Sequence, residues 1–110
     1  MKITERHEDG IIVFVIEGRV DSQGAIDLDN ALQTAVDNGH YRLVCDMGNV
    51  AFINSAALRT LADIISRTRA NNGDLRLAAL PPKVRRVLQI VGFDRYSAIF
   101  ETTEEALQNF

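Results

Sequence analysis

The chain has 110 residues, of which 46% are hydrophobic and 25% charged, a length and balance that fit one globular domain over residues 1–110. Its formal net charge of −3 argues against nucleic-acid binding, and a single cysteine excludes an internal disulfide and favours a reducing, cytoplasmic setting. Since no apolar run reaches the ~18 residues of a membrane-spanning helix and the N-terminus lacks a signal-peptide core, we expect no direct membrane insertion.

The first third of the chain predicts a β-hairpin followed by a helix. Residues 3–7 alternate weakly, as an edge strand does, and Asp9-Gly10 is a strong two-residue hairpin turn. The six apolar residues Ile11–Ile16 are typical of a strand buried on both faces, which we expect Gly18 to end. After a short link, an apolar stripe predicts a helix that stops at Asn38-Gly39; the stripe consists of Leu28, Leu32, Ala35 and Val36.

The middle of the chain predicts a strand, a polar turn and a long helix. The strand is expected over Tyr41–Asp46, the helix begins at the turn Asn54-Ser55 and runs to about Ala70, and Asn71-Asn72-Gly73 stops it. One stripe of this helix is apolar and should face the core, namely Leu58, Leu61, Ile65 and Thr68. The side expected to face water carries Arg59, Asp63, Ser66 and Arg67.

The last third predicts two short strands and two helices. Residues 75–79 alternate as a strand, and Pro81-Pro82 can begin a helix because proline is tolerated in the first turn. The apolar repeat of that helix, which Gly92 ends, is Val84, Val87, Leu88 and Val91. Ile99-Phe100 is a short last strand, and a final helix begins with a threonine cap and two acidic residues, Thr102 or Thr103 with Glu104 and Glu105.

The order of these elements predicts an α/β fold. Two strands come first, and helices and strands then alternate to the end of the chain. Alternation of this kind favours a parallel sheet joined by helical crossovers. We therefore expect one domain with a mixed, mostly parallel sheet of about five strands, an antiparallel N-terminal edge hairpin and four helices.

The polar turn Asn54-Ser55 has two interpretations. Asn54 or Ser55 could simply cap the helix, since both residue types are favoured at that position. Ser55 could instead accept a phosphate, because the free N–H groups and the dipole of a helix start stabilise a dianion. A phosphate there would repel an acidic partner from this surface.

Two carboxylates, Asp21 and Asp46, follow the expected ends of neighbouring parallel strands. The Ser55 turn is expected at the same edge of the sheet, which is where sites gather in such folds. The pair could hold Mg²⁺ or orient a hydroxyl, or could serve only as turn caps and solvated loop residues.

No other residue pattern points to catalysis, to a metal or to a cofactor. Cys45 lies in an apolar strand as a small filler, and His7 and His40 lack metal-ligand partners at the required spacing. A phosphoacceptor receiver domain is disfavoured, because the acid pair after the first parallel strand and the late lysine are missing. A basic group at the start of the third helix is either a solvated face or a dock for an acidic partner: Lys83, Arg85 and Arg86.

Several of these elements, taken in order, resemble the STAS domain family of anti-sigma factor antagonists. After the opening hairpin, the stretch Glu17–Asp21 resembles the family's Gly-x-hydrophobic-Asp element, and a strand then ends at Asp46. Val50–Ile53 leads into the signature turn, and Gly92-Phe93 follows the third helix. The resemblance covers nearly the whole chain.

The signature turn departs from the family pattern at three positions. The family commonly has Asp-Ser-Ser-Gly-Leu or Asp-Ser-Thr-Gly-Leu, and this chain has Asn54-Ser55-Ala56-Ala57-Leu58. Ser55 matches the first hydroxyl residue, whereas Ala56 replaces the second, which is phosphorylated in some members. Ser55 is therefore the remaining phosphoacceptor candidate in the turn.

The resemblance implies a partner-switching regulator of transcription with no catalytic activity or cofactor. The unmodified protein would bind an anti-sigma factor, often a serine protein kinase, and so free a sigma factor; phosphorylation would release the partner, and a phosphatase could restore binding. The implied partner-binding residues are Asp21, Asn54, Ser55, Ala56, Ala57, Arg59 and Asp63.

A second function is compatible with the same resemblance. A STAS domain can be an accessory subunit of a membrane transporter ATPase complex, where it binds the ATPase and needs no phosphoacceptor. Ala56 suits this alternative, and the genes beside the coding sequence would separate the two.

Overall fold

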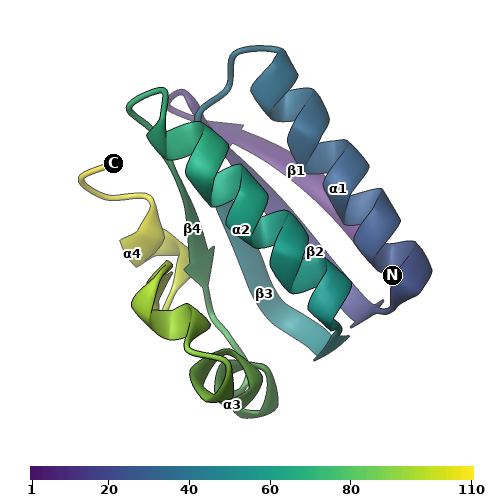
Figure 1. The fold of residues 1–110 in the computed structure, drawn as a ribbon. Helices are drawn as coiled ribbons and strands as arrows, with labels where there is room; N and C mark the ends of the chain where they lie inside the picture. Colours follow the sequence, from purple (N-terminus) through teal and green to yellow (C-terminus); the bar gives the residue numbers. More distant parts are fainter.

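The computed structural model describes residues 1–110 and contains a five-stranded sheet whose strands lie in chain order (Figure 1). β1 and β2 pair antiparallel and all later neighbours pair parallel, which confirms the predicted mixed sheet with its N-terminal hairpin. The strands are β1 (Lys2–Glu8), β2 (Ile11–Val20), β3 (Arg42–Ile53), β4 (Asp74–Ala78) and β5 (Ala98–Phe100).

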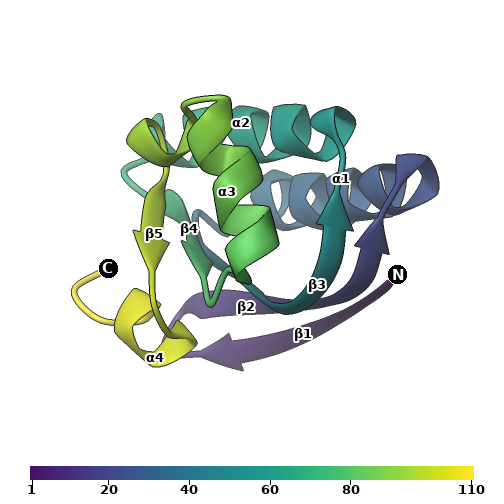
Figure 2. The same ribbon diagram turned by 90° about the horizontal axis from the view of Figure 1, so that it is seen from below.

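Four α-helices accompany the sheet, as the sequence predicts. They are α1 (Ser22–Asp37), α2 (Ser55–Arg69), α3 (Pro82–Ile90) and α4 (Thr103–Ala106), and a 3₁₀ turn, η1 (Phe93–Arg95), follows α3. α1 and α2 lie side by side on one face of the sheet with α3 beyond them, whereas α4 lies toward the other face (Figure 2). None of these helices combines the length and the apolar character needed to cross a lipid bilayer.

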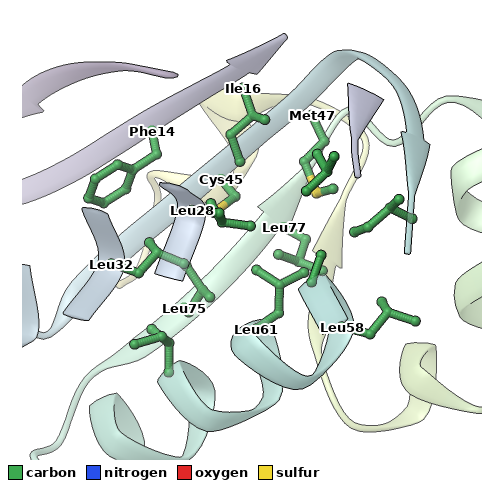
Figure 3. Packing of buried hydrophobic residues seen from close by; sticks show 14 of the residues in the cluster. Phe14, Ile16, Leu28, Leu32, Cys45, Met47, Leu58, Leu61, Leu75 and Leu77 are labelled. Atoms are coloured by element: carbon green, nitrogen blue, oxygen red, sulfur yellow. The ribbon is translucent and has the colours of Figure 1, made fainter. Parts of the chain in front are cut away.

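Both faces of the central strands are buried, because alternate residues of a strand point to opposite sides. Toward α1 and α2, large apolar side chains from strands and helices meet in the main cluster (Figure 3), which includes Phe14, Ile16, Leu28, Leu32, Cys45, Met47, Leu58, Leu61, Leu75 and Leu77. A smaller cluster covers the other face and consists of Ile11, Val13, Val44, Ala78 and Ala106. The uninterrupted apolar run in β2 follows from this two-sided burial.

The two turn-forming glycines of the N-terminal region behave differently. Asp9 and Gly10 have φ of 50° and 80°, so the hairpin turn uses two left-handed residues, as a type I′ turn requires. Gly18, by contrast, does not end β2, and that prediction was wrong. With φ of 96° it lies at a register irregularity between β2 and β3, so it forms a bulge through which the strand continues to Val20.

β3 is also longer than predicted, and its extra length determines where the following turn lies. β4 pairs with β3 only as far as Asp46, whereas β2 remains paired with it as far as Ile53. The end of β3 is therefore a two-stranded extension that reaches beyond β4 and up to the start of α2 (Figure 2). This extension positions the turn at Asn54.

The apolar repeat predicted for α3 is only half correct. Val84 and Leu88 are buried, but Val87 and Val91 are 38% and 59% exposed. α3 has only two and a half turns and rests on the sheet through a narrow stripe, so the outer apolar positions remain in contact with solvent.

Candidate functional site

The starts of α1 and α2 are adjacent because the two preceding strands end together. Val20, the last residue of β2, pairs with Ile53, the last residue of β3. The N–H of Asn54 then donates a hydrogen bond to the carbonyl of Val20 (3.2 Å). The residues that follow the two strands, Asp21 and Asn54, therefore lie at neighbouring positions at one edge of the molecule.

Both residues cap their helices in the same way. Oδ1 of Asp21 accepts a hydrogen bond from the N–H of Gly24, and Oδ1 of Asn54 accepts one from the N–H of Ala57, each at 2.9 Å. Of the two capping residues that the sequence allows, Asn54 is thus the one used, and Ser55 is the first residue of α2. The Ser55 side chain is exposed, and capping does not require its hydroxyl.

The first turn of α2 has the properties that an anionic group requires. A helix start leaves four N–H groups without helical partners, and the Asn54 side chain accepts only from Ala57. The N–H groups of Ser55 and Ala56, which come before Ala57, lie at the positive end of the helix dipole. A negative charge carried by Ser55 would therefore be stabilised within this chain.

A groove between α1 and α2 begins beside this turn and contains three of the predicted partner-binding residues. We call it the α1–α2 groove; its volume is about 430 Å³, and it is lined by Ser22, Ala25, Ile26, Asp29, Gln33, Ala56, Arg59, Thr60 and Asp63. Ile26 is 55% exposed, and Arg59 is exposed and forms no ion pair. An apolar side chain and a free cation are thus presented on the two walls.

Asp63, by contrast, is held by a polar network across the groove. Nε2 of Gln33 donates to Oδ2 of Asp63 (2.7 Å) and to Oδ1 of Asp29 (3.2 Å). Arg67 donates to Oε1 of Gln33 and to Oδ1 of Asp37 (3.1 Å). The network joins α1 to α2, so Asp63 fixes the shape of the groove as well as lining it.

Sequence reasoning missed the α1 side of the groove. Ile26, Asp29 and Gln33 recur at helical spacing along one side of α1, outside its core stripe. That spacing could have indicated a shared face. Which neighbour the face meets depends on how α1 and α2 pack, and no local pattern specifies this.

Asp46 does not lie at the edge with Asp21 and Ser55, so its predicted position at a strand end was wrong; of the two interpretations of these carboxylates, turn capping is the one observed. Asp46 lies within β3, opposite Val15 and Ala78, and its Oδ1 accepts a hydrogen bond from the N–H of Gly48 (3.0 Å). It precedes the last residue of β3 by seven positions, roughly 20 Å of extended strand. The two aspartates therefore form no shared Mg²⁺ site.

Cys45 fills space in the core, as predicted. It is fully buried in the main cluster. Burial, with a smaller contribution from the negative charge of Asp46, raises the pKa of the Cys45 thiol to about 12. The thiol is therefore protonated and unreactive at neutral pH.

Comparison with known proteins relates the chain and its fold to one family. A family model described as "STAS domain" matches residues 2–106. The chain is 34% identical to the protein named "Putative anti-sigma factor antagonist BtrV" of Bordetella bronchiseptica, over 100% of this chain and 95% of that protein. The crystal structure of an anti-sigma factor antagonist from Mycobacterium paratuberculosis matches with a TM-score of 0.87 at 26% identity, covering 96% of this chain and 90% of that chain.

A more distant structure shares the fold alone. SpoIIAA of Bacillus, in its phosphorylated form, matches with a TM-score of 0.76 at 18% identity over 96% of each chain. The model match and the full-length relative extend over the strands, the capped turn and the helices described above. The chain therefore belongs to the STAS domain family.

Proposed function

We propose that this protein is a non-catalytic partner-switching regulator that binds an anti-sigma factor of the serine kinase type and so releases a sigma factor. Residues 1–110 act as one STAS domain in the cytoplasm. Phosphorylation of Ser55 ends the complex, and a phosphatase restores it. The observation that carries the proposal is the exposed Ser55 at the capped start of α2, next to the Asp21 cap. The full-length similarity to a protein named as an anti-sigma factor antagonist supports it.

The docking surface is the Ser55 turn together with the α1–α2 groove. Protein interfaces commonly bury about 800 Å² on each partner and depend on a few central anchors, among which arginine is enriched. Arg59 and the exposed Ile26 provide a cation and an apolar contact on opposite walls. The Gln33–Asp63 hydrogen bond holds those walls in place before the partner arrives, which lowers the entropic cost of binding.

The charge change on phosphorylation explains the switch. A phosphoserine carries about −1.5 to −2 charge at neutral pH. The helix start tolerates that charge while it is solvated, but a partner seated on the turn would have to remove its water. Because Ala56 and Ala57 have no hydroxyl, Ser55 is the acceptor in this turn.

The test uses the cognate anti-sigma kinase with ATP. We expect the unmodified chain to bind the kinase, and intact-mass measurement to show a gain of about 80 Da, which is one phosphate. Ser55→Ala should bind and stay unmodified, and Ser55→Glu should bind more weakly. Ser66→Ala, at an exposed serine near the other end of α2, is the matched control and should behave as wild type. If the chain binds a transporter ATPase and no anti-sigma factor, the accessory-subunit function replaces this proposal.

A further inference from the structure

A second groove lies on the other side of the Ser55 turn, between the end of β3 and α3. We call it the α3 groove; its volume is about 150 Å³, and it is lined by Ala51, Phe52, Ile53, Lys83, Val84 and Val87. Five of these six residues are apolar, and Phe52 and Val87 are each 38% exposed. Large apolar side chains in a concave site are the usual feature of a docking pocket.

The α3 groove has a basic rim whose charges are not paired within the chain. The guanidinium carbon of Arg19 lies 4.4 Å from the ring centroid of Phe52. Lys83 lines the groove, and Arg86 is exposed on the same helix. None of the three forms an ion pair, whereas their neighbour Arg85 binds Glu101 at 3.1 Å. α3 contains no acidic residue, so this rim is positive on a chain whose net charge is −3.

The groove continues the surface around the Ser55 turn. Phe52 precedes the Asn54 cap by two residues, and Arg19 precedes the Asp21 cap by two. A protein seated on the two caps would therefore lie next to residues of the α3 groove and its rim. The size of the groove limits what it holds, since an apolar cavity of about 150 Å³ takes one benzene ring.

We propose that the α3 groove binds one large apolar side chain from an acidic segment of the anti-sigma partner. This inference rests on the proposed function, because the occupant belongs to the same partner. The apolar side chain packs between Phe52 and Val87, and adjacent carboxylates pair with Arg19, Lys83 and Arg86. A lipid surface fits this site less well, because a concave groove sized for one ring offers little area to a flat bilayer.

The test measures affinity and association rate between the full chain and the purified cognate anti-sigma factor. Val87→Asp places a carboxylate against the incoming acidic segment and should weaken binding at least tenfold. Lys83→Glu should slow association about fivefold and flatten its salt dependence, because exposed charges at a rim act mainly on encounter. Arg42→Glu is the matched control, because it makes the same charge change at the opposite end of β3 and should alter the rate less than twofold.

A second measurement keeps the inference testable if Val87→Asp disturbs folding. Amide hydrogen exchange of the wild-type chain should slow in α3 when the anti-sigma factor binds. Unchanged exchange in α3, with Lys83→Glu binding as wild type, overturns the inference and leaves the proposed function standing. Absence of any binding by the wild type overturns both.

Vesicles of phosphatidylglycerol and phosphatidylcholine test whether the α3 groove binds a membrane surface instead. We expect the wild-type chain not to sediment with them. Sedimentation that Lys83→Glu abolishes, together with an unchanged affinity of that variant for the anti-sigma factor, would assign the groove to a membrane surface and overturn the inference.

Discussion

The two faces of the sheet are covered by different kinds of structure. On one face, the long helices α1 and α2 bury large aliphatic side chains from most of their turns. On the other face, a four-residue helix, α4, and the last residues of the chain cover a much smaller apolar cluster. An isolated helix of four residues has no stability in water, so something other than helix propensity must hold that segment in place.

Arg76 holds the C-terminal segment through its charged end. Its Nη1 donates to the carbonyls of Ala106 (2.9 Å) and Gln108 (2.7 Å), and its Nη2 donates to that of Asn109 (2.9 Å). The guanidinium also lies 4.1 Å from the ring centroid of Phe110. One side chain from β4 thus satisfies the carbonyl of the last residue of α4 and two carbonyls of the residues that follow it.

This contrast indicates that the helical face supports the candidate docking surface, whereas the opposite face does not. The face with long helices has many redundant apolar contacts, and the capped turn and both grooves lie at the edge of that rigid layer. A docking surface needs such support, because a mobile one would have to be ordered on binding. The other face has a small apolar cluster and one polar side chain, Arg76, that binds the C-terminal segment, so a change at Arg76 should remain local.

The largest effect is expected from a cavity in the helical face. Leu61 is fully buried between α2 and the sheet, so Leu61→Ala should lower the free energy of unfolding by about 2–5 kcal/mol. Urea unfolding followed by circular dichroism measures this change. Ser66→Ala, on the exposed side of the same helix, should stay within about 0.5 kcal/mol of wild type. Similar losses for both variants would show that this layer does not dominate stability.

A smaller and more local effect is expected on the opposite face. Arg76→Ala removes three hydrogen bonds from a charged group and the packing against Phe110, which should cost about 2 kcal/mol. Hydrogen exchange should accelerate in residues 103–110 and stay unchanged in α2. Arg42→Ala, an exposed arginine at the start of β3, is the control. Equal acceleration in α2 would contradict the independence of the two faces.

The sequence predicts most of the fold but only part of the site, for identifiable reasons. Hydrophobic periodicity locates the long elements β2, α1, α2 and β4, because each buries a face of its own, whereas cap and turn residues locate β1 and α4. The end of β3 was missed because Gly48 and Asn49 resemble a turn, whereas pairing with β2 from Asn49 onward continues the strand to Ile53. The exposed positions of Ser55 and Arg59 can be predicted from the start and the periodicity of one helix. Ile26 and Gln33 line a groove that exists only where α1 meets α2, so no local pattern predicts their role.

The buried Cys45 thiol should make the stability of the protein depend on pH in the alkaline range. Its side chain points into the helical cluster, while its neighbour Asp46 belongs to the opposite side of β3. The thiol has a pKa of about 12 when folded, above its ordinary value of 9.0. Its contribution is therefore fully present below about pH 9 and is lost as the pH rises toward 12, because only the unfolded thiol ionises in that window.

The matched variant for this titration is Cys45→Ala. Between about pH 9 and pH 11, the wild type should lose roughly 2 kcal/mol more of its free energy of unfolding than the variant loses. Urea unfolding of both proteins at each pH gives the difference between their free energies of unfolding. The small cavity in the variant lowers its stability by the same amount at every pH, so it does not affect how this difference changes with pH. Parallel curves would mean that the thiol is hydrated in the folded state.

The smallest effect is expected at the edge where the docking surface begins. Asn54→Ala removes the cap of α2 and should cost about 1 kcal/mol, and Asp21→Ala should cost a similar amount at α1. Asn54→Asp keeps the cap oxygen and adds a negative charge at the positive end of the helix dipole, so it should instead add about 0.3–1 kcal/mol at low ionic strength. Thermal unfolding at two salt concentrations separates the dipole contribution, which salt screens, from the hydrogen bond, which it leaves intact. If Asn54→Asp proved no more stable than Asn54→Ala, the Asn54 side chain would not be the cap of α2, and the account of Ser55 as a free hydroxyl at a capped helix start would have to be abandoned.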